Sequence, residues 1–297
     1  VFDLGVSVPD VVDDRVVLLF RWGRPVTGEF VFEDLEYCNF YNGLSFYLAT
    51  DSDIRIGGPG RGIIARNGNL SAVELQDTSN SHVEVSNLEA YGMGGVYVGQ
   101  GLYGIYGDDF GETYPELLPE LSTFDFHHNT IHLAEDGFWA GFELWNSRKR
   151  FSDGPNTILA NITQNTFHFN DSEDFYRDFP GIFSCGVDDA LVNGNNFRGR
   201  SSEAMNPEIF SLWGQCGGEG WSIVGNNFSG FDTFSAPLIL WPGTSNFSVV
   251  GGNIKHNVLD FGTNNTLAGV DNMGPVVPPD TLGREISADL KRKGRFH

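Results

Sequence analysis

The stretch of sequence that decides the fold is a short motif that returns in the second half of the chain. It reads LVNGNNF at residues 191–197, SIVGNNF at residues 222–228 and SVVGGNI at residues 248–254. The copies are separated by 31 and 26 residues, which aligns Gly194, Gly225 and Gly251. A motif that recurs at such spacing indicates that one structural unit is repeated along the chain.

Earlier copies extend the repeat toward the N-terminus. Each has apolar residues close together, then small or polar residues, often Asn, and then a further apolar residue; copies begin at Phe30, Val83, Phe124 and Ile162. A second pattern of alternating apolar residues follows roughly 8–16 residues later. It is found at residues 44–46, 73–75, 96–98, 142–145, 183–185, 210–213 and 238–241.

The alternation predicts strands with one inward and one outward face. A doubly wound sheet needs helical segments between its strands, and none is visible. A β-sandwich would not repeat one motif in the same order. A chain that coils, with two short strands per repeat stacked on their equivalents, satisfies the pattern and buries many of its 25 Phe residues. Asn suits the bends because it tolerates left-handed conformations and can hydrogen-bond along the stack.

These repeats resemble those of right-handed parallel β-helix repeat proteins of the pectate-lyase-like superfamily, over about residues 28–270. The resemblance implies an all-β fold, a single-stranded right-handed parallel β-helix (a solenoid) of about eight coils. We expect residues 1–28 to form an N-terminal coil or cap, 29–274 the β-helix, and 275–297 a Pro-rich segment and short helix that caps the C-terminal end. Related folds include polysaccharide lyases, polygalacturonases, phage tailspikes and adhesins, so the fold leaves the activity open.

Composition narrows the classes of partner. The 297 residues are 40% hydrophobic, with 39 acidic against 18 basic residues and a formal net charge of −21. This acidity would repel a phosphate backbone and predicts no nucleic-acid partner, although solubility explains it equally well. No stretch reaches the roughly 18 apolar residues of a membrane span. The chain begins at Val1 with no visible leader, so we expect a mature product or an excised domain, located outside the cell or at its surface, of open oligomeric state.

The outward residues of the second pattern should form two columns if its strands stack in register. The first column would hold Ser45, Glu74, Tyr97, Glu143, Ser184, Ser211 and Ile239. The second would hold Tyr47, Gln76, Gly99, Trp145, Gly186, Trp213 and Trp241. Aromatic rings along an edge suit the flat apolar faces of sugars, and a basic run follows Trp145. We therefore predict a substrate-binding set of Tyr47, Tyr97, Trp145, Trp213, Trp241 and Arg148. The alternative is that residues 146–157 or the C-terminal tail cover these rings.

A pair of carboxylates in the first column is the candidate catalytic site. Glu74 and Glu143 would lie two strands apart, roughly 9–10 Å, with the Tyr97 hydroxyl between them. That separation is at the upper edge of what an inverting glycosidase needs, with one carboxylic acid protonating the leaving oxygen and the other activating water. The alternative is two solvated glutamates on a strand, and a register error of one residue would remove the pair.

Other motifs give weaker evidence for catalysis, metal binding or disulfide bonding. Asp188 and Asp189 resemble the paired aspartates of polygalacturonases, but the rest of that family's pattern is missing and a solvated turn explains them. The histidines offer no metal spacing, and we predict no metal site and no cofactor. Ca²⁺ stays open, because acidic clusters at residues 108–112 and 171–174 supply too few oxygens by themselves. The cysteines Cys38, Cys185 and Cys216 form no CxxC pair or disulfide framework, and Cys185 is expected in the core.

We therefore expect an extracellular β-helix protein that binds or processes a polysaccharide, as a hydrolase or lyase, along the side formed by the second strands. The competing expectation is a structural or adhesive surface module without catalysis.

Overall fold

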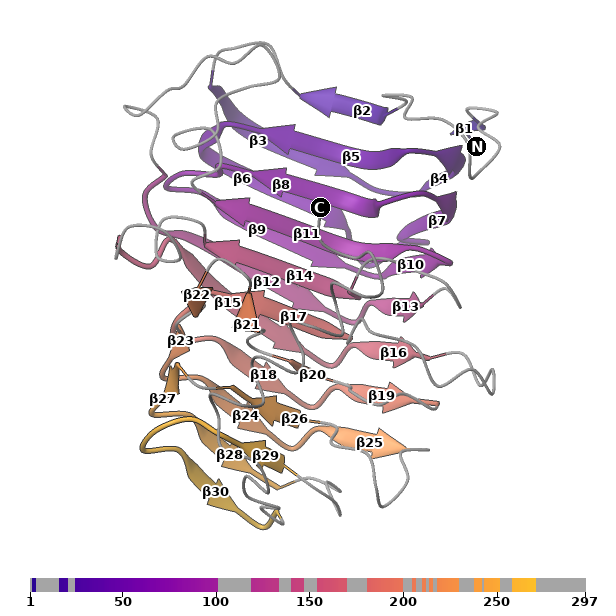
Figure 1. Ribbon diagram of the computed structural model, residues 1–297. Helices are drawn as coiled ribbons and strands as arrows, with labels where there is room; N and C mark the ends of the chain where they lie inside the picture. The colour runs from indigo at the N-terminus through magenta and orange to yellow at the C-terminus, as the bar shows by residue number, and fades with distance from the viewer. Residues whose placement is uncertain are drawn as a thin grey trace.

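The computed structural model describes residues 2–3, 16–20, 25–100, 119–133, 140–146, 154–169, 181–199, 205–206, 210–211, 214–215, 218–229, 238–241, 243–251 and 258–270. Within these ranges every regular element is a β-strand, and most strands belong to three long sheets (Figure 1). No helix there is long and apolar enough to cross a membrane.

We name the three large sheets A, B and C. Sheet A contains, in spatial order, β1 (Phe2–Asp3), β4 (Leu35–Phe40), β7 (Ile63–Gly68), β10 (Leu88–Tyr91), β13 (Thr130–His132), β16 (Thr166–His168), β19 (Asn196–Arg198) and β25 (Asn227–Ser229). Sheet B contains β2 (Val16–Phe20), β5 (Asn42–Tyr47), β8 (Ser71–Gln76), β11 (Gly94–Gln100), β14 (Phe142–Asn146), β17 (Ile182–Cys185), β20 (Met205–Asn206), β26 (Leu238–Leu240) and β29 (Val258–Asp260). Sheet C contains β3 (Val26–Phe32), β6 (Ala49–Gly57), β9 (His82–Ser86), β12 (Ser122–His127), β15 (Ile158–Thr163), β18 (Leu191–Asn193), β24 (Ser222–Val224), β28 (Ser248–Val250) and β30 (Thr266–Ala268).

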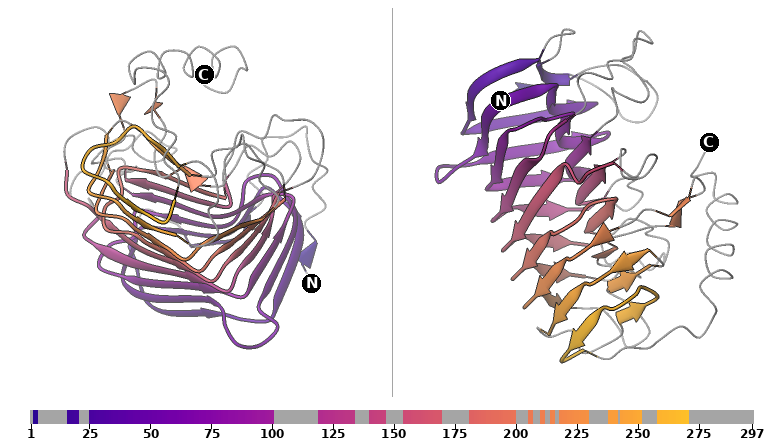
Figure 2. Two further views of the ribbon diagram at one scale, coloured as in Figure 1. Left: turned by 90° about the horizontal axis from the view of Figure 1, so that it is seen from below. Right: turned by 90° about the vertical axis from the view of Figure 1, so that its left-hand side faces the viewer.

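Neighbouring strands in all three sheets are parallel, and from β3 to β20 the chain enters sheets C, A and B in strict rotation. Figure 2 shows the consequence: seen along the stack, the strands surround a common interior, and seen from the side they descend regularly from the N-terminal to the C-terminal end. The protein is therefore all-β with long parallel sheets, an arrangement compatible with the expected β-helix.

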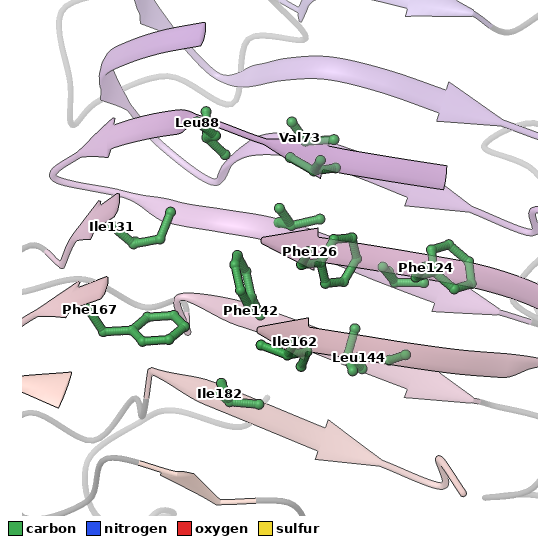
Figure 3. Packing of buried hydrophobic residues seen from close by; sticks show 14 of the residues in the cluster. Val73, Leu88, Phe124, Phe126, Ile131, Phe142, Leu144, Ile162, Phe167 and Ile182 are labelled. Carbon is green, nitrogen blue, oxygen red and sulfur yellow. The ribbon is translucent and has the colours of Figure 1, made fainter. Parts of the chain in front are cut away.

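The interior is one continuous apolar cluster filled by alternate residues from the three sheets (Figure 3). The ring of Phe142, from sheet B, meets that of Phe167, from sheet A, with centroids 5.2 Å apart. Phe167 then stacks on Phe197 at 4.9 Å, and Phe197 on Phe228 at 4.8 Å, along sheet A. Because each layer covers the next, buried Phe rings recur along the stack. Their burial stabilises the fold through the hydrophobic effect, as the repeated Phe positions predict.

The prediction of two strands per repeat is wrong, because there are three. The first motif contains two strands from different sheets: β9 ends at Ser86, Asn87 adopts a left-handed φ of 52°, and β10 begins at Leu88. The apolar residue after the polar bend is thus the centre of a separate strand in sheet A. The bend takes so few residues that the two strands read as one pattern in the sequence.

The bend between sheets C and A depends on two adjacent residues, one that turns the backbone and one that hydrogen-bonds to the next layer. The first has positive φ and is occupied by His128, Gln164, Gly194 and Gly225 in successive layers. The second is the buried asparagine ladder, formed by Asn129, Asn165, Asn195 and Asn226. Each of the first three asparagines donates from Nδ2 to Oδ1 of the next at 3.0 Å. The expected bonding of Asn along the stack is confirmed, while the left-handed turn in these layers belongs to the preceding residue.

We expect Gly194→Ala to lower the free energy of unfolding by about 1 kcal/mol, because an L-residue at its φ of 65° is strained. Steric overlap contributes little, since a Cβ there would meet only Gln164 Cγ, at 3.8 Å. Denaturant titration measures the loss. The matched control is Gln164→Gly, which relieves the same strain one layer away and should not destabilise. Equal losses from both substitutions would contradict this assignment.

The register of β17 corrects the sequence alignment by one residue. Glu143 pairs with Phe183, Leu144 with Ser184 and Trp145 with Cys185, so Ser184 takes the inward position and Cys185 the outward one. The strand after β17 in sheet B is β20, not residues 210–213. Instead β21 (Phe210–Ser211) pairs antiparallel with β22 (Gly214–Gln215), so Ser211 lies outside the column; β23 (Gly218–Glu219) and β27 (Thr244–Ser245) form a further small parallel pair.

The expectation that Cys185 lies in the main core is also wrong. Cys185 is disulfide-bonded, and it packs with Ala140 and Phe183 in a small cluster separate from the main core. Cys38 is free, and Cys216 lies outside the described residues. The sequence alignment places Cys185 on the inward face because it is one residue out of register at β17.

Candidate functional site

The candidate site lies on the outward face of sheet B. Pairing places Ser45 beside Glu74, Glu74 beside Tyr97, and Tyr97 beside Glu143, in the predicted order. Parallel strands are about 4.8 Å apart, so Glu74 and Glu143 are separated by about 9.6 Å at the backbone, with Tyr97 between them.

Glu74 lies at the centre of a hydrogen-bond network. Its Oε2 accepts from Asn42 Nδ2 at 2.6 Å, from the Tyr47 hydroxyl at 2.8 Å and from Ser45 Oγ at 3.2 Å. Its Oε1 accepts from Gln76 Nε2. The glutamate is only 7% exposed. A carboxylate only accepts hydrogen bonds, so four donors around one side chain match an ionised Glu74.

Glu143 has a different environment, although it is equally buried, at 7% exposure. Trp145 Nε1 donates to its Oε1 at 2.5 Å, while its Oε2 is buried and accepts from no described residue. Burial raises the pKa of Glu143 to about 7, against the smaller opposing effect of the Trp145 hydrogen bond. Near neutral pH this carboxyl group therefore exchanges a proton readily, as a general acid or base must.

The two glutamates thus form a pair with contrasting surroundings. Glu74 has several donors and Glu143 has one, two layers apart on the same face. Carboxyl groups in such unlike environments are the usual arrangement where one acts as acid and the other as its ionised partner.

The aromatic residues of this face are less open than the sequence suggests. Trp145 is half-buried and its ring lies 5.0 Å from that of Phe183, which takes the outward position because of the register of β17. Trp241 is 3% exposed and stacks on Phe261 at 5.9 Å. Tyr47 and Tyr97 are each half-buried. A row of open tryptophan faces is therefore absent among the described residues. The aromatic side chains beside the glutamates are Tyr47, Tyr97, Trp145 and the buried Phe183.

Two predicted binding residues, Trp213 and Arg148, lie outside the described residues, as do the acidic clusters at 108–112 and 171–174. Asp188 Oδ1 accepts from the Glu219 backbone N–H at 2.8 Å, and Asp189 has a φ of 57°. Both aspartates therefore belong to a turn, in agreement with the simpler explanation of that motif. In the part of the chain that is described, no group of three or more His, Cys, Asp or Glu residues could hold a metal ion.

No family model, no curated protein and no solved structure matches this chain. Functional reasoning therefore depends on the fold and on the local chemistry of its faces.

The sequence analysis missed Asn42 and gave no role to Gln76. Gln76 stands two residues after Glu74 on the same strand face, so the period-two pattern could have identified it as a neighbour. Asn42 could not be found in this way, because strict alternation with the buried Leu44 and Phe46 assigns it to the inward face. Only the tertiary structure shows that its Nδ2 lies 2.6 Å from Glu74 Oε2.

Proposed function

We propose that this chain is a right-handed parallel β-helix protein of the pectate-lyase-like kind that cleaves an extracellular polysaccharide on the outward face of sheet B. The rotation of the chain through three parallel sheets supports the β-helix, for which we keep about eight coils and a C-terminal capping segment. The observation that carries the activity is the pair Glu143 and Glu74, a protonatable buried carboxyl group two strands from a fully hydrogen-bonded one.

In this proposal Glu143 is the general acid and protonates the leaving glycosidic oxygen. Its raised pKa keeps a fraction protonated near neutral pH, which the reaction requires. Glu74 is the second carboxylate, which orients and activates water on the opposite side of the bond. The backbones of the two glutamates lie about 9.6 Å apart, close to the roughly 6.5–9.5 Å between carboxyl groups with which inverting glycosidases accommodate a water molecule. Tyr47, Tyr97 and Trp145 contact the sugar rings.

The burial of the same residues favours a second candidate, a structural or adhesive module without catalysis. Glu74 and Glu143 are each 7% exposed, and Trp241 is 3% exposed. The four hydrogen bonds that Glu74 accepts are also what a carboxylate with a purely structural role would have. In that case the network fixes neighbouring strands of sheet B, and the face needs no substrate.

The test is to incubate the purified chain with a panel of neutral and acidic polysaccharides, with and without Ca²⁺, and to assay new reducing ends and unsaturated products. We expect reducing ends without unsaturation, and a rate that declines above about pH 7 as Glu143 loses its proton. Glu143→Gln should lower the rate at least about a hundredfold, whereas Glu120→Gln, at an exposed site, should not. Unsaturated products would indicate a lyase instead, and an inert wild type would favour the module.

A further inference from the structure

The outward face of sheet A carries an unusual row of side chains, which we name the sheet A strip: Arg66, Tyr91, His132, His168 and Arg198. They are adjacent in register on β7, β10, β13, β16 and β19. The residues between them, such as Ala90, Ile131 and Phe167, point into the core and are fully buried. The strip is thus a continuous line of cationic and titratable groups on a chain whose net charge is −21.

The strip is pre-ordered by stacking. The Arg66 guanidinium lies 4.2 Å from the centroid of the Tyr91 ring, the Tyr91 and His132 rings are 4.3 Å apart, and the His132 and His168 rings are 4.5 Å apart. Both ring pairs are nearly parallel, at 6° and 5°. Holding these side chains in one conformation lowers the entropic cost of binding a ligand along them.

Stacking also determines which atoms a ligand can reach. Neighbours lie on both faces of the Tyr91 and His132 rings and on one face of the His168 ring, while 34% of the His132 side chain and 41% of the Arg66 side chain stay exposed. Ring edges and guanidinium groups present N–H donors. Covered faces cannot stack with nucleic-acid bases, so the strip lacks the feature by which single strands are usually held.

The outward column beside the strip, two residues earlier on each strand, changes from acidic to neutral side chains along sheet A. Toward Arg66 it holds carboxylates: Glu36 lies 3.6 Å from Arg66, and Glu89 accepts from the Tyr91 hydroxyl. Glu89 Oε1 also lies 4.0 Å from His132 Nε2, so the carboxylates end beside His132. Beside His132, His168 and Arg198 it holds Thr130, Thr166 and Asn196, which are neutral hydroxyl and amide groups. The lower half of sheet A therefore offers imidazole and guanidinium donors in one column and hydroxyl or amide groups in the next, repeated about every 4.8 Å.

We propose that this half of sheet A binds a linear polysaccharide that carries carboxylate groups, with His132, His168 and Arg198 contacting the carboxylates and Thr130, Thr166 and Asn196 the hydroxyls. Such a ligand has negative groups and hydroxyls repeated along one direction, matching both columns. The site is separate from the glutamates of sheet B and does not depend on cleavage there.

Binding of this kind strengthens in acid, when the imidazoles become cationic. Burial lowers the pKa of His132 below its ordinary value, with Arg66 lowering it further and Glu89 opposing. Burial also lowers the pKa of His168, assisted by the positive charges of His132 and Arg198. An anionic ligand between these groups offsets their mutual repulsion, so protonation and binding favour each other.

The experiment measures the affinity of the purified chain for alginate, a polyuronate, at about pH 5 and about pH 8, on either side of the ordinary histidine pKa of about 6.5. We expect binding at least about tenfold tighter at the lower pH, and Arg198→Gln to weaken it about tenfold at both. The double substitution His132→Gln with His168→Gln should abolish the difference between the two pH values. Because these residues are on the surface, the variants should keep the wild-type circular dichroism spectrum.

Controls separate the proposal from general charge effects. Arg55→Gln removes one positive charge from the outward face of sheet C and should leave alginate binding unchanged. Neutral dextran and a single-stranded oligonucleotide should bind at least about tenfold more weakly than alginate. The proposal is overturned if the strip variants bind alginate as the wild type does, or if the oligonucleotide binds equally well.

Discussion

Glu143→Gln is expected to raise the free energy of unfolding by about 3 kcal/mol at pH about 8, although the substitution removes the proposed acid. Burial raises the pKa of this carboxyl group from 4.5 to about 7, so the folded state holds a proton that the unfolded state has released. The stability from this group is complete below about pH 4.5 and is lost as the pH rises through about 7. Two and a half pKa units correspond to about 3 kcal/mol.

The measurement is a set of denaturant titrations of the wild type and the variant at several pH values. The difference between the two curves should grow from near zero at about pH 4 to its full size above about pH 7. Taking the difference removes the contribution of His132 and His168, whose lowered pKa values weaken the fold as the pH falls. Glu120→Gln, at an exposed site, should change stability by less than about 0.5 kcal/mol.

Together with the cleavage assay, this result separates the two candidate functions. A carboxyl group that costs stability when ionised, yet is required for turnover, is typical of an active site. A pH-independent difference would show that Glu143 is not held in the protonatable state that its burial implies. A loss of stability at every pH would assign the group a structural role instead.

Asn165→Ala is the substitution expected to weaken the fold most, by about 3–5 kcal/mol. The Asn165 side chain is fully buried and donates to the Phe126 carbonyl at 2.8 Å and to Asn195 Oδ1 at 3.0 Å. Its Oδ1 accepts from both the backbone N–H and Nδ2 of Asn129. Removing the amide leaves the buried backbone N–H of Asn129 without its acceptor and takes one hydrogen bond each from Asn129 Nδ2, the Phe126 carbonyl and Asn195 Oδ1. A buried group left unsatisfied costs about 1–3 kcal/mol, and each further hydrogen bond lost costs about 1 kcal/mol.

Two further variants test whether the loss of stability comes from the hydrogen bonds of the asparagine ladder. Asn161→Ala, on the outward face of β15, removes only a partly buried hydrogen bond to Asp125 and should cost less than about 1 kcal/mol. Asn165→Asp keeps the shape but turns a donor into an acceptor facing two oxygens, so it should destabilise at least as much as the alanine variant. Denaturant midpoints provide the comparison. Equal midpoints for Asn161→Ala and Asn165→Ala would contradict the role of the ladder.

Much of the candidate site could be predicted from the sequence alone. Period-two alternation assigned Glu74, Tyr97 and Glu143 to the outward face, and the repeat stacked them in the correct order. This succeeded because side-chain direction in a strand depends only on position, and equivalent strands in successive repeats begin with similar patterns. The environments of the glutamates, and hence the raised pKa of Glu143, depend on burial and were not predictable.

The sequence by itself determined that the described part of the chain is all-β, that its strands stack repeat on repeat, and, outside β17, much of the apolar interior. Tertiary structure alone decided the third strand of each layer, the register of β17 and the stacked rings of Tyr91, His132 and His168. The physical reason is that alternation fixes faces within a strand, whereas register between strands depends on the path of the intervening chain. A shift of one residue exchanges the two faces, as Ser184 and Cys185 demonstrate.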